Sequence, residues 1–262
     1  MHDRNPPPSV GLIITTYNRP DALAAVLRSV RAQTITPHEI IISDDGSSTE
    51  TALVVQNFKR QLPIKHCWLP DCSFRAARAR NLAVAKSTAQ YLIFIDGDVL
   101  LPKAFIENHL QLSQSGTIIA GNRKILSPET TSRILDETNI ATANYVFKST
   151  KFRRLWLGIF RDHFWNTLES VRTCNLSLFR EDAYAVGGFD ESFVGWGRED
   201  TDFVARSVNS GMRIRSGRFA VAGAHLWHKE SPRDNLSSNE GMLQMTIRSR
   251  STMPRKSLIG EL

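Results

Sequence analysis

Residues 91–98 read Tyr-Leu-Ile-Phe-Ile-Asp-Gly-Asp, an apolar run that ends in two carboxylates separated by a glycine. Such a run predicts a short strand covered on both faces, as in a parallel sheet with helices above and below it. Two similar runs precede it, at Val10–Ile14 and Glu39–Ser43, and each leads into polar, turn-forming residues. In sheets of this kind ligands bind beyond the carboxyl ends of the strands, so these polar ends are candidate site residues.

Helical spacing alternates with the apolar runs. Pro20 suits the first turn of a helix, and apolar residues then recur at helical spacing from Leu23 to Val30. Further helices are expected at 75–86, 102–115 and near 200–210, and further strands at 64–69, 117–121, 174–179 and near 219–225. This alternation predicts an α/β fold with a central, mostly parallel sheet and helices on both faces.

The chain divides into four expected parts. Residues 1–121 form a regular first half, 122–172 an insertion without a clear strand pattern, 173–230 a second half, and 231–262 a polar, loop-like tail. A hydrophobic content of 41% over 262 residues is ordinary for a globular protein and too high for a disordered one. Motifs of other classes are missing: the sequence has no P-loop, no Gly-x-Gly-x-x-Gly after the first strand and no Gly-x-Ser-x-Gly.

The charge balance favours an anionic partner. Lys and Arg number 33 against 26 Asp and Glu, which gives a formal net charge of +7. Nucleic acid, an anionic membrane surface or a phosphorylated substrate would each suit this balance. Nucleic acid is disfavoured because the basic stretches outside the insertion carry no interleaved aromatic residues. Three cysteines, no export signal and no apolar run of the roughly 20 residues that a membrane helix needs lead us to expect a cytoplasmic protein.

Asp96 and Asp98 follow the strand at 91–95 directly. Two hard oxygen ligands at a strand end suit Mg²⁺ or Mn²⁺ that is shared with the phosphate oxygens of a substrate. An ordinary acidic turn is the structural alternative.

A second acidic motif, Gly-Trp-Gly-Arg-Glu-Asp-Thr-Asp, occupies residues 195–202. Carboxylates this close repel one another, so a purely structural role requires that they cap the N-terminus of a helix. The functional interpretation is a general base with a hydroxyl-binding neighbour, beside a tryptophan that offers a flat apolar face to a sugar.

His225 and His228 lie near the end of a late strand. Strand alternation tends to place residues i and i+3 on opposite faces, so the two need not share one metal. One of them could complete a site begun by Asp98.

Three motifs in order resemble one family. Ser9–Ser48, with Thr-Thr-Tyr-Asn-Arg-Pro at 15–20 and Asp-Asp-Gly-Ser at 44–47, resembles the start of family 2 glycosyltransferases of the GT-A fold. Arg78–Asp98 continues the similarity in the family's order. Gly187–Asp202 is similar to the acceptor-side motif of β-galactosyltransferases and chondroitin-polymerase-type enzymes.

The resemblance implies an inverting, metal-dependent glycosyltransferase. It would move a sugar from a nucleoside-diphosphate sugar, with UDP favoured, to a hydroxyl of a glycan or lipid-linked acceptor in cell-surface polysaccharide or lipopolysaccharide synthesis. Residues 1–121 would bind the donor and 173–230 the acceptor.

The resemblance also implies roles for individual residues. The nucleotide-sugar-binding residues are Thr15, Tyr17, Asn18, Asp45, Arg75, Arg78 and Asp96. The Mn²⁺ or Mg²⁺ ligands are Asp98 with His225, which aligns best, or its close competitor His228. The acceptor-binding residues are Trp196, Gly197 and Glu199, and Asp200 acts as the catalytic base.

Two other functions fit parts of the pattern. A nucleotidyltransferase of the same fold is disfavoured because it has no use for the acceptor motif, and a non-catalytic nucleotide-sugar binder because it needs no base. The insertion has two interpretations of its own. Its apolar residues share one helical face between Phe152 and Phe160, with basic residues elsewhere, which is typical of a helix on an anionic membrane. A helix packed on the sheet with its arginines in solvent is the alternative.

Overall fold

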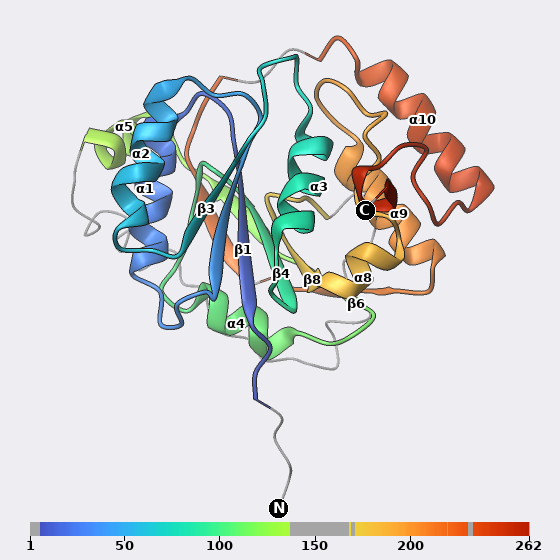
Figure 1. The fold of residues 1–262 in the computed structure, drawn as a ribbon, viewed down its shortest axis with the longest axis horizontal. Helices are drawn as coiled ribbons and strands as arrows, with labels where there is room; N and C mark the ends of the chain where they lie inside the picture. The colour runs from blue at the N-terminus through green and yellow to red at the C-terminus, as the bar shows by residue number, and fades with distance from the viewer. Residues whose placement is uncertain (1–5, 137–167, 169–170, 219, 230–232, 262) are drawn as a thin grey trace, which may run out of the picture.

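The computed structural model describes the chain except for residues 1–5, 137–167, 169–170, 219, 230–232 and 262. The strands of its main sheet are β1 (Val10–Thr16), β2 (Glu39–Asp44), β3 (Ile64–Trp68), β4 (Tyr91–Asp96), β6 (Thr117–Ala120), β8 (Asn175–Phe179) and β9 (Arg213–Ser216). Their order across this seven-stranded sheet is β3-β2-β1-β4-β8-β6-β9 (Figure 1). Only β8 runs antiparallel to its neighbours β4 and β6, so the mostly parallel sheet predicted from the sequence is confirmed.

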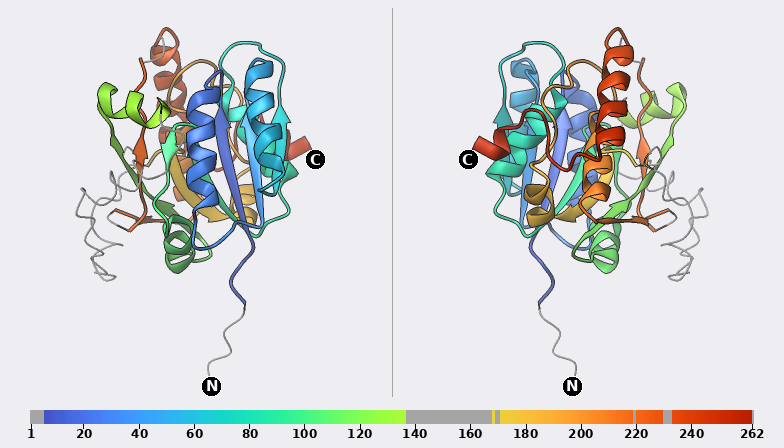
Figure 2. Two further views of the ribbon diagram at one scale, coloured as in Figure 1. Left: turned by 90° about the vertical axis from the view of Figure 1, so that its left-hand side faces the viewer. Right: turned by 90° about the vertical axis from the view of Figure 1, so that its right-hand side faces the viewer.

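Helices cover both faces of the sheet, as the two side views show (Figure 2). One face carries α1 (Pro20–Arg31), α2 (Thr49–Lys59) and α4 (Phe105–Leu112), and the other α3 (Ala76–Lys86), α8 (Arg180–Ala185) and α9 (Glu199–Asn209). Alternate residues of β4 feed two separate cores: Ile93 and Ile95 pack with the first group of helices, whereas Leu92 and Phe94 pack with the second. The apolar run at 91–95 is therefore buried on both faces.

The structure also has a second, smaller sheet, which the sequence predicted only in part. Its strands are β5 (Val99–Leu100), β10 (Ala222–His225) and β7 (Asn122–Ile125), and α5 (Pro128–Asp136) follows β7. The sequence shows no clear strand pattern in 122–172, yet the structure has β7 there, because its Asn-Arg-Lys sequence is mostly exposed and carries no apolar alternation. The helix predicted between 151 and 165 lies outside the described residues.

The tail is also more ordered than expected. Instead of a loop, it forms α10 (Leu236–Ser249) and a 3₁₀ turn at Leu258–Glu261. The buried face of α10 consists of Asn239, Leu243 and Thr246, so two of its three buried residues are polar and the apolar period is lost. None of the helices in the described part of the chain is long and apolar enough to cross a membrane.

Candidate active site

The ends of β1, β2 and β4 bring the first predicted residues together. Thr15 lies beside Asp96 in the sheet and Thr16 beside Asp44, so the polar strand ends share one edge. Gly97 then turns the chain, and its N–H donates to the Thr15 carbonyl at 2.7 Å. A Cβ at position 97 would lie 3.0 Å from Thr16 Oγ1 and 3.1 Å from the Thr15 carbonyl, so a larger residue between the two carboxylates would crowd the end of β1.

Asp98 lies between both candidate histidines. His225 Nε2 is 3.4 Å from one carboxylate oxygen of Asp98, and His228 Nε2 is 3.2 Å from the other. β10 ends at His225, and the Leu226 N–H donates to the Asp98 carbonyl at 2.9 Å. His228 therefore lies past the strand, where alternation no longer applies. The tendency of strand alternation to place residues i and i+3 on opposite faces therefore does not act here, and both rings lie against Asp98.

These three side chains fit a divalent cation. Their ligand atoms lie within 4.8 Å of one another, and Asp98 Oδ1 and His225 Nδ1 are buried with no hydrogen-bond partner in the described structure. Burial would raise the pKa of Asp98, but the hydrogen bond to His228 and the charges of the two rings hold it below its usual value. Burial lowers the pKa of His225, which favours the neutral ring that a metal requires. One carboxylate with two imidazoles suits Mn²⁺ better than Mg²⁺, which strongly prefers oxygen.

Asp45 and Arg75 form the next part of the edge. Asp45 is buried, and its Oδ2 accepts the Arg75 N–H at 2.5 Å while the Arg75 Nε lies 3.9 Å from Oδ1. Burial raises the pKa of Asp45 to about 6. Its Oδ1 has no hydrogen-bond partner among the described residues, so an acceptor atom remains for a ligand.

Tyr17 and Asn18 have different surroundings. The Tyr17 ring is half-exposed and its hydroxyl donates to Asp71 at 3.1 Å, so the ring is accessible beside the strand ends. Asn18 adopts a left-handed backbone conformation with φ of 47°. Its N–H donates to Ser47 Oγ, and its side-chain oxygen accepts the Ser48 N–H at 2.8 Å. That oxygen already joins the loops after β1 and β2.

The basic residues of α3 separate in space. Arg78 is exposed, and its Nη1 lies 3.5 Å from Glu191 Oε2. Arg80 was not singled out from the sequence, yet it is buried and its Nη1 donates to Glu199 Oε1 at 2.9 Å. Its Nη2 lies 3.6 Å from Asp96 Oδ1. Arg80 thus lies between Asp96 at the strand ends and Glu199 of the second acidic motif, a position that the spacing of the motifs did not reveal.

The Gly-Trp-Gly loop is shaped by its backbone and held by α10. Gly197 has φ of +100°, and the next residue, Arg198, also lies in the left-handed region. The buried side chain of Asn239 donates to the Gly197 carbonyl at 2.9 Å, and Arg198 pairs with Glu240 at 2.6 Å. Trp196 is 38% exposed, and the Arg233 guanidinium lies over its ring, 4.8 Å from the ring centre.

Glu199 and Asp200 begin α9, where the helix dipole favours negative charge. Glu199 is buried, and this burial, together with the neighbouring Asp200, raises its pKa despite the Arg80 contact. Asp200 Oδ1 accepts the Thr201 N–H at 2.7 Å, and no described residue donates a hydrogen bond to the other oxygen. Asp202 has a structural role instead: it is buried and accepts hydrogen bonds from Arg206 and Thr246.

Arg123 is a second basic residue that the sequence did not reveal. It lies on β7 beside Gly223 of β10, and its Nη1 hydrogen-bonds the buried Cys174 thiol at 2.6 Å. Burial alone would lower the pKa of Arg123, but the contact with Cys174 and the negative charges of Asp96 and Asp98 raise it. A permanent positive charge therefore faces the carboxylates of the strand end. β7 gave no strand signal, so nothing in the sequence connected Arg123 to this site.

The order of these motifs and the fold agree with known proteins. Residues 12–187 match the family profile described as glycosyl transferase family 2. The chain belongs to glycosyl transferase family 2. Residues 153–229 also match the profile described as the N-terminal domain of galactosyltransferase. The resemblance noted from the sequence is therefore confirmed.

Similar proteins include validoxylamine A glucosyltransferase of Streptomyces hygroscopicus subsp. limoneus, which is 29% identical over 254 residues. The match covers 88% of this chain and 54% of that protein. Chondroitin synthase of Escherichia coli is 28% identical over 251 residues, covering 85% of this chain and 35% of the synthase. The chain thus spans about half of the first relative's length and about a third of the second's.

Solved structures confirm the GT-A fold. A mannosyltransferase from Pyrobaculum calidifontis, in complex with GDP-Man and Mn²⁺, superposes with a TM-score of 0.65 at 16% identity, over 94% of this chain and 64% of that one. S. aureus TarS 1-349 in complex with UDP gives 0.60 at 17% identity, over 92% of this chain and 65% of that one.

Proposed function

We propose that this chain is an inverting, metal-dependent glycosyltransferase that moves a sugar from a nucleoside-diphosphate sugar to a hydroxyl of a glycan or glycolipid acceptor. One observation carries the proposal: Arg80 contacts both Asp96 and Glu199, so the strand-end carboxylates and the acceptor motif face the same space. A nucleotidyltransferase would leave Glu199 and Asp200 without a role.

The donor side consists of the strand ends. Asp45, with its unpartnered buried oxygen, and the half-exposed ring of Tyr17 would bind the base and ribose. Arg75 and Arg123 supply positive charge for a diphosphate. Asp98, His225 and His228 would hold Mn²⁺, which supplies Lewis-acid neutralisation of the leaving diphosphate when it is bound.

The acceptor side consists of the loop at 195–200. Trp196 would stack on an acceptor sugar, and Glu199 would accept a hydrogen bond from one of its hydroxyls. Asp200 would take the proton from the attacking hydroxyl as the new glycosidic bond forms. The hydroxyl attacks the anomeric carbon opposite the departing diphosphate, which inverts that centre.

The relatives support a role in polysaccharide synthesis. Several are named for the synthesis of chondroitin, hyaluronan or O-antigen. UDP is our first choice of nucleotide, because TarS structures contain UDP and UDP-GlcNAc, and GDP is the second because of the GDP-Man complex. The cytoplasmic location and the docking of residues 151–165 on an anionic membrane stay predictions, and flotation with anionic liposomes tests the docking.

The deciding experiment is thermal melting with UDP, GDP, CDP or dTDP, each with and without Mn²⁺. A ligand at a hundred times its dissociation constant adds about 2.7 kcal/mol, which corresponds to a rise of roughly 5–10 °C in a chain of this size. We expect one nucleotide to give this rise only when Mn²⁺ is present.

Asp98→Asn is the matched variant for this experiment, and it should remove the metal-dependent rise while the protein remains folded. No rise with any nucleotide would contradict the proposal. A rise without sugar transfer to any acceptor would instead favour a non-catalytic nucleotide-sugar binder.

A further inference from the structure

Arg80 is a buried charge between two parts of the chain that are distant in sequence. It lies on α3, and its side chain is only 5% exposed. Burying an arginine costs several kcal/mol unless its charge is compensated. The compensation comes from Asp96 at the end of β4 and from Glu199 at the start of α9. Its guanidinium also lies 5.6 Å from the centre of the Phe189 ring.

The contacts of Arg80 are unequal and incomplete. Nη1 is 2.9 Å from Glu199, whereas Nη2 is 3.6 Å from Asp96, beyond a direct hydrogen bond. Arg80 Nε and Glu199 Oε2 have no hydrogen-bond partner in the described structure. The Arg80 guanidinium therefore has unused donors and lies between two carboxylates that compete for it. A change at Asp96 alters the strength of its contact with Glu199, and a change at Glu199 alters its contact with Asp96.

Arg206 shows what a purely structural buried arginine looks like in the same protein. Its Nε donates to Asp202 at 2.8 Å, and its other two nitrogens donate to the carbonyls of Val186 and Gly188 at 2.6 and 2.7 Å. All three nitrogens have close partners, and none of these partners lies at the strand ends. Arg80 differs on both counts.

We propose that Arg80 is a positioning residue that couples the nucleotide side of the site, through Asp96, to the acceptor side, through Glu199. This inference rests on the proposed function, because it requires a nucleoside diphosphate beside Asp96. When the nucleotide engages Asp96, the contact between Arg80 and Glu199 strengthens and fixes the start of α9, where the acceptor hydroxyl and Asp200 meet. Charge at Glu199 therefore influences nucleotide affinity through this arginine.

A double-mutant cycle on nucleotide binding tests the coupling without any acceptor. Calorimetry measures the dissociation constant of the nucleoside diphosphate chosen by melting, with Mn²⁺, for the native chain, Arg80→Lys, Glu199→Gln and the double variant. Lysine keeps the charge but reaches only one carboxylate. Because coupling is reciprocal, loss of a contact that nucleotide binding strengthens must lower nucleotide affinity. We therefore expect Glu199→Gln to weaken binding in the native background by about threefold more than in the Arg80→Lys background. This difference is about 0.7 kcal/mol at 1.4 kcal/mol per tenfold change.

Equal effects of Glu199→Gln in the two backgrounds would overturn the coupling while leaving the proposed function intact. A native chain that binds no nucleotide would overturn both. Arg206→Lys is the matched control, and it should lower the melting temperature without changing nucleotide affinity. This outcome would show that loss of a buried guanidinium does not by itself change nucleotide affinity.

Glu199→Asp keeps the test decisive if Arg80→Lys does not fold. This substitution retains the negative charge but withdraws it from the guanidinium. Coupling through the contact predicts that both Glu199→Asp and Glu199→Gln change the dissociation constant. A change with Gln alone would mean that only the long-range field of Glu199 acts, and it would contradict the proposal.

Discussion

The two ends of β2 carry buried carboxylates whose pKa values are shifted in opposite directions. Glu39 opens the strand and Asp45 follows its last residue, and each is only 3% exposed. Nevertheless, the pKa of Glu39 falls to about 2, whereas the pKa of Asp45 rises to about 6. Burial pushes both pKa values upward, so the difference arises from the hydrogen bonds that each carboxylate receives.

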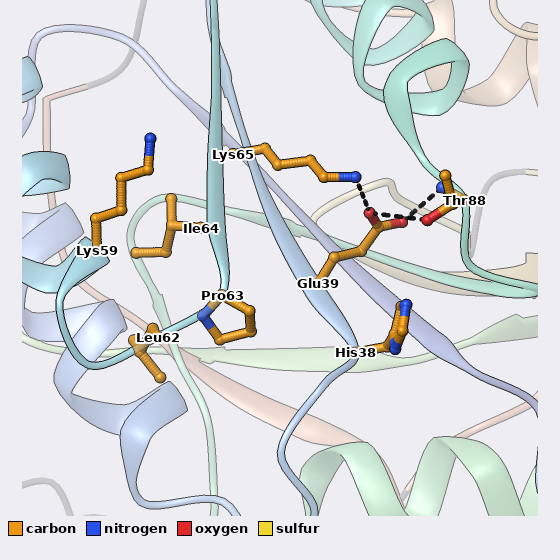
Figure 3. Close-up of a pocket in the computed structure, with 8 residues that line it drawn as sticks. All are labelled: His38, Glu39, Lys59, Leu62, Pro63, Ile64, Lys65 and Thr88. Carbon is orange, nitrogen blue, oxygen red and sulfur yellow. Dashed lines mark hydrogen bonds and ion pairs between the residues drawn. The ribbon is translucent and has the colours of Figure 1, made fainter.

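Glu39 is fully satisfied by its surroundings. Its Oε1 accepts hydrogen bonds from Ser87 Oγ and from the N–H groups of Thr88 and Ala89, and its Oε2 accepts from Lys65 Nζ at 2.6 Å. It lies in a shallow pocket at the amino end of the sheet, with Lys65 and Thr88 converging on it (Figure 3). Glu39 thereby ties the start of β2 to the turn before β4.

Asp45 receives one close hydrogen bond, from Arg75, and keeps a buried oxygen without a partner among the described residues. Asp98, His225 and Glu199 at the same edge also keep unpartnered buried atoms. Proteins rarely leave such atoms unpaired, so a cluster of them at one edge indicates a place reserved for ligands. The carboxylate at one end of the strand is therefore fully paired within the fold, whereas the one at the other end keeps an open acceptor atom, as the proposed ligand site requires.

The largest expected effect comes from the carboxyl edge. Asp200→Asn removes the proposed base but retains the shape of the side chain, so transfer should fall by about 10²–10⁴-fold. Nucleotide affinity and melting temperature should stay near those of the native chain, because Asn can still accept the Thr201 N–H. Measurement of kcat for transfer and of nucleotide binding by calorimetry checks both parts. Equal loss of binding and transfer would contradict the role of Asp200 as base.

The next largest effect belongs to the amino edge. Glu39→Gln replaces a carboxylate that accepts five hydrogen bonds by an amide that cannot match them, so we expect the free energy of unfolding to fall by about 2 kcal/mol. The folded pKa is lowered, so the stabilisation is complete above about pH 4.5 and is lost as the pH falls toward 2.

Urea unfolding at pH 7 and pH 3 measures this loss, and the difference between native and variant should shrink at pH 3. The folded variant should transfer sugar at the native rate. A difference that stays the same at both pH values would contradict the role of the Glu39 charge.

Asp45→Asn should affect the free energy of unfolding in the opposite way to Glu39→Gln. The folded pKa of Asp45 is raised, so its contribution to stability decreases as the pH rises from 3.8 toward 6, and at neutral pH the charge is held against its preference. We expect Asp45→Asn to leave the free energy of unfolding unchanged or to raise it by up to about 1 kcal/mol at pH 7.5, while nucleotide binding weakens. Loss of more than about 1 kcal/mol of stability would place Asp45 in the same class as Glu39.

The sequence predicted the residues at the carboxyl ends of the parallel strands better than those at the amino ends. The apolar runs at 10–14, 39–43 and 91–95 located the parallel strands, because burial on both faces leaves a clear signal. Parallel strands end at one edge, so the positions of Asp45, Asp96 and Asp98 along the chain were enough to group them. The roles of individual residues came from the family resemblance and remain to be tested.

What the sequence could not show depends on partners distant along the chain. Glu39 is an ordinary first residue of a strand until the turn at 87–89 folds onto it. Arg80 and Arg123 come close to the carboxylates of the strand ends only because the folded chain places α3 and β7 beside them. The helix α10 packs through Asn239 and Thr246, and its contact with the Gly-Trp-Gly loop has no local signature. Polar contacts between segments that are distant along the chain therefore could not be predicted from the sequence.

The smallest expected effect separates two sources of the Glu39 stabilisation. The Lys65 side chain is 47% exposed, so its ion pair is screened by solvent, and we expect Lys65→Met to cost only about 0.5 kcal/mol. Lys59→Met is the matched control, because Lys59 lines the same pocket and Figure 3 draws no contact between it and Glu39. Urea unfolding of both variants in low and high salt should show a small, salt-sensitive difference. A loss as large as that of Glu39→Gln would mean that the exposed ammonium, and not the buried donors at 87–89, holds the amino end of β2.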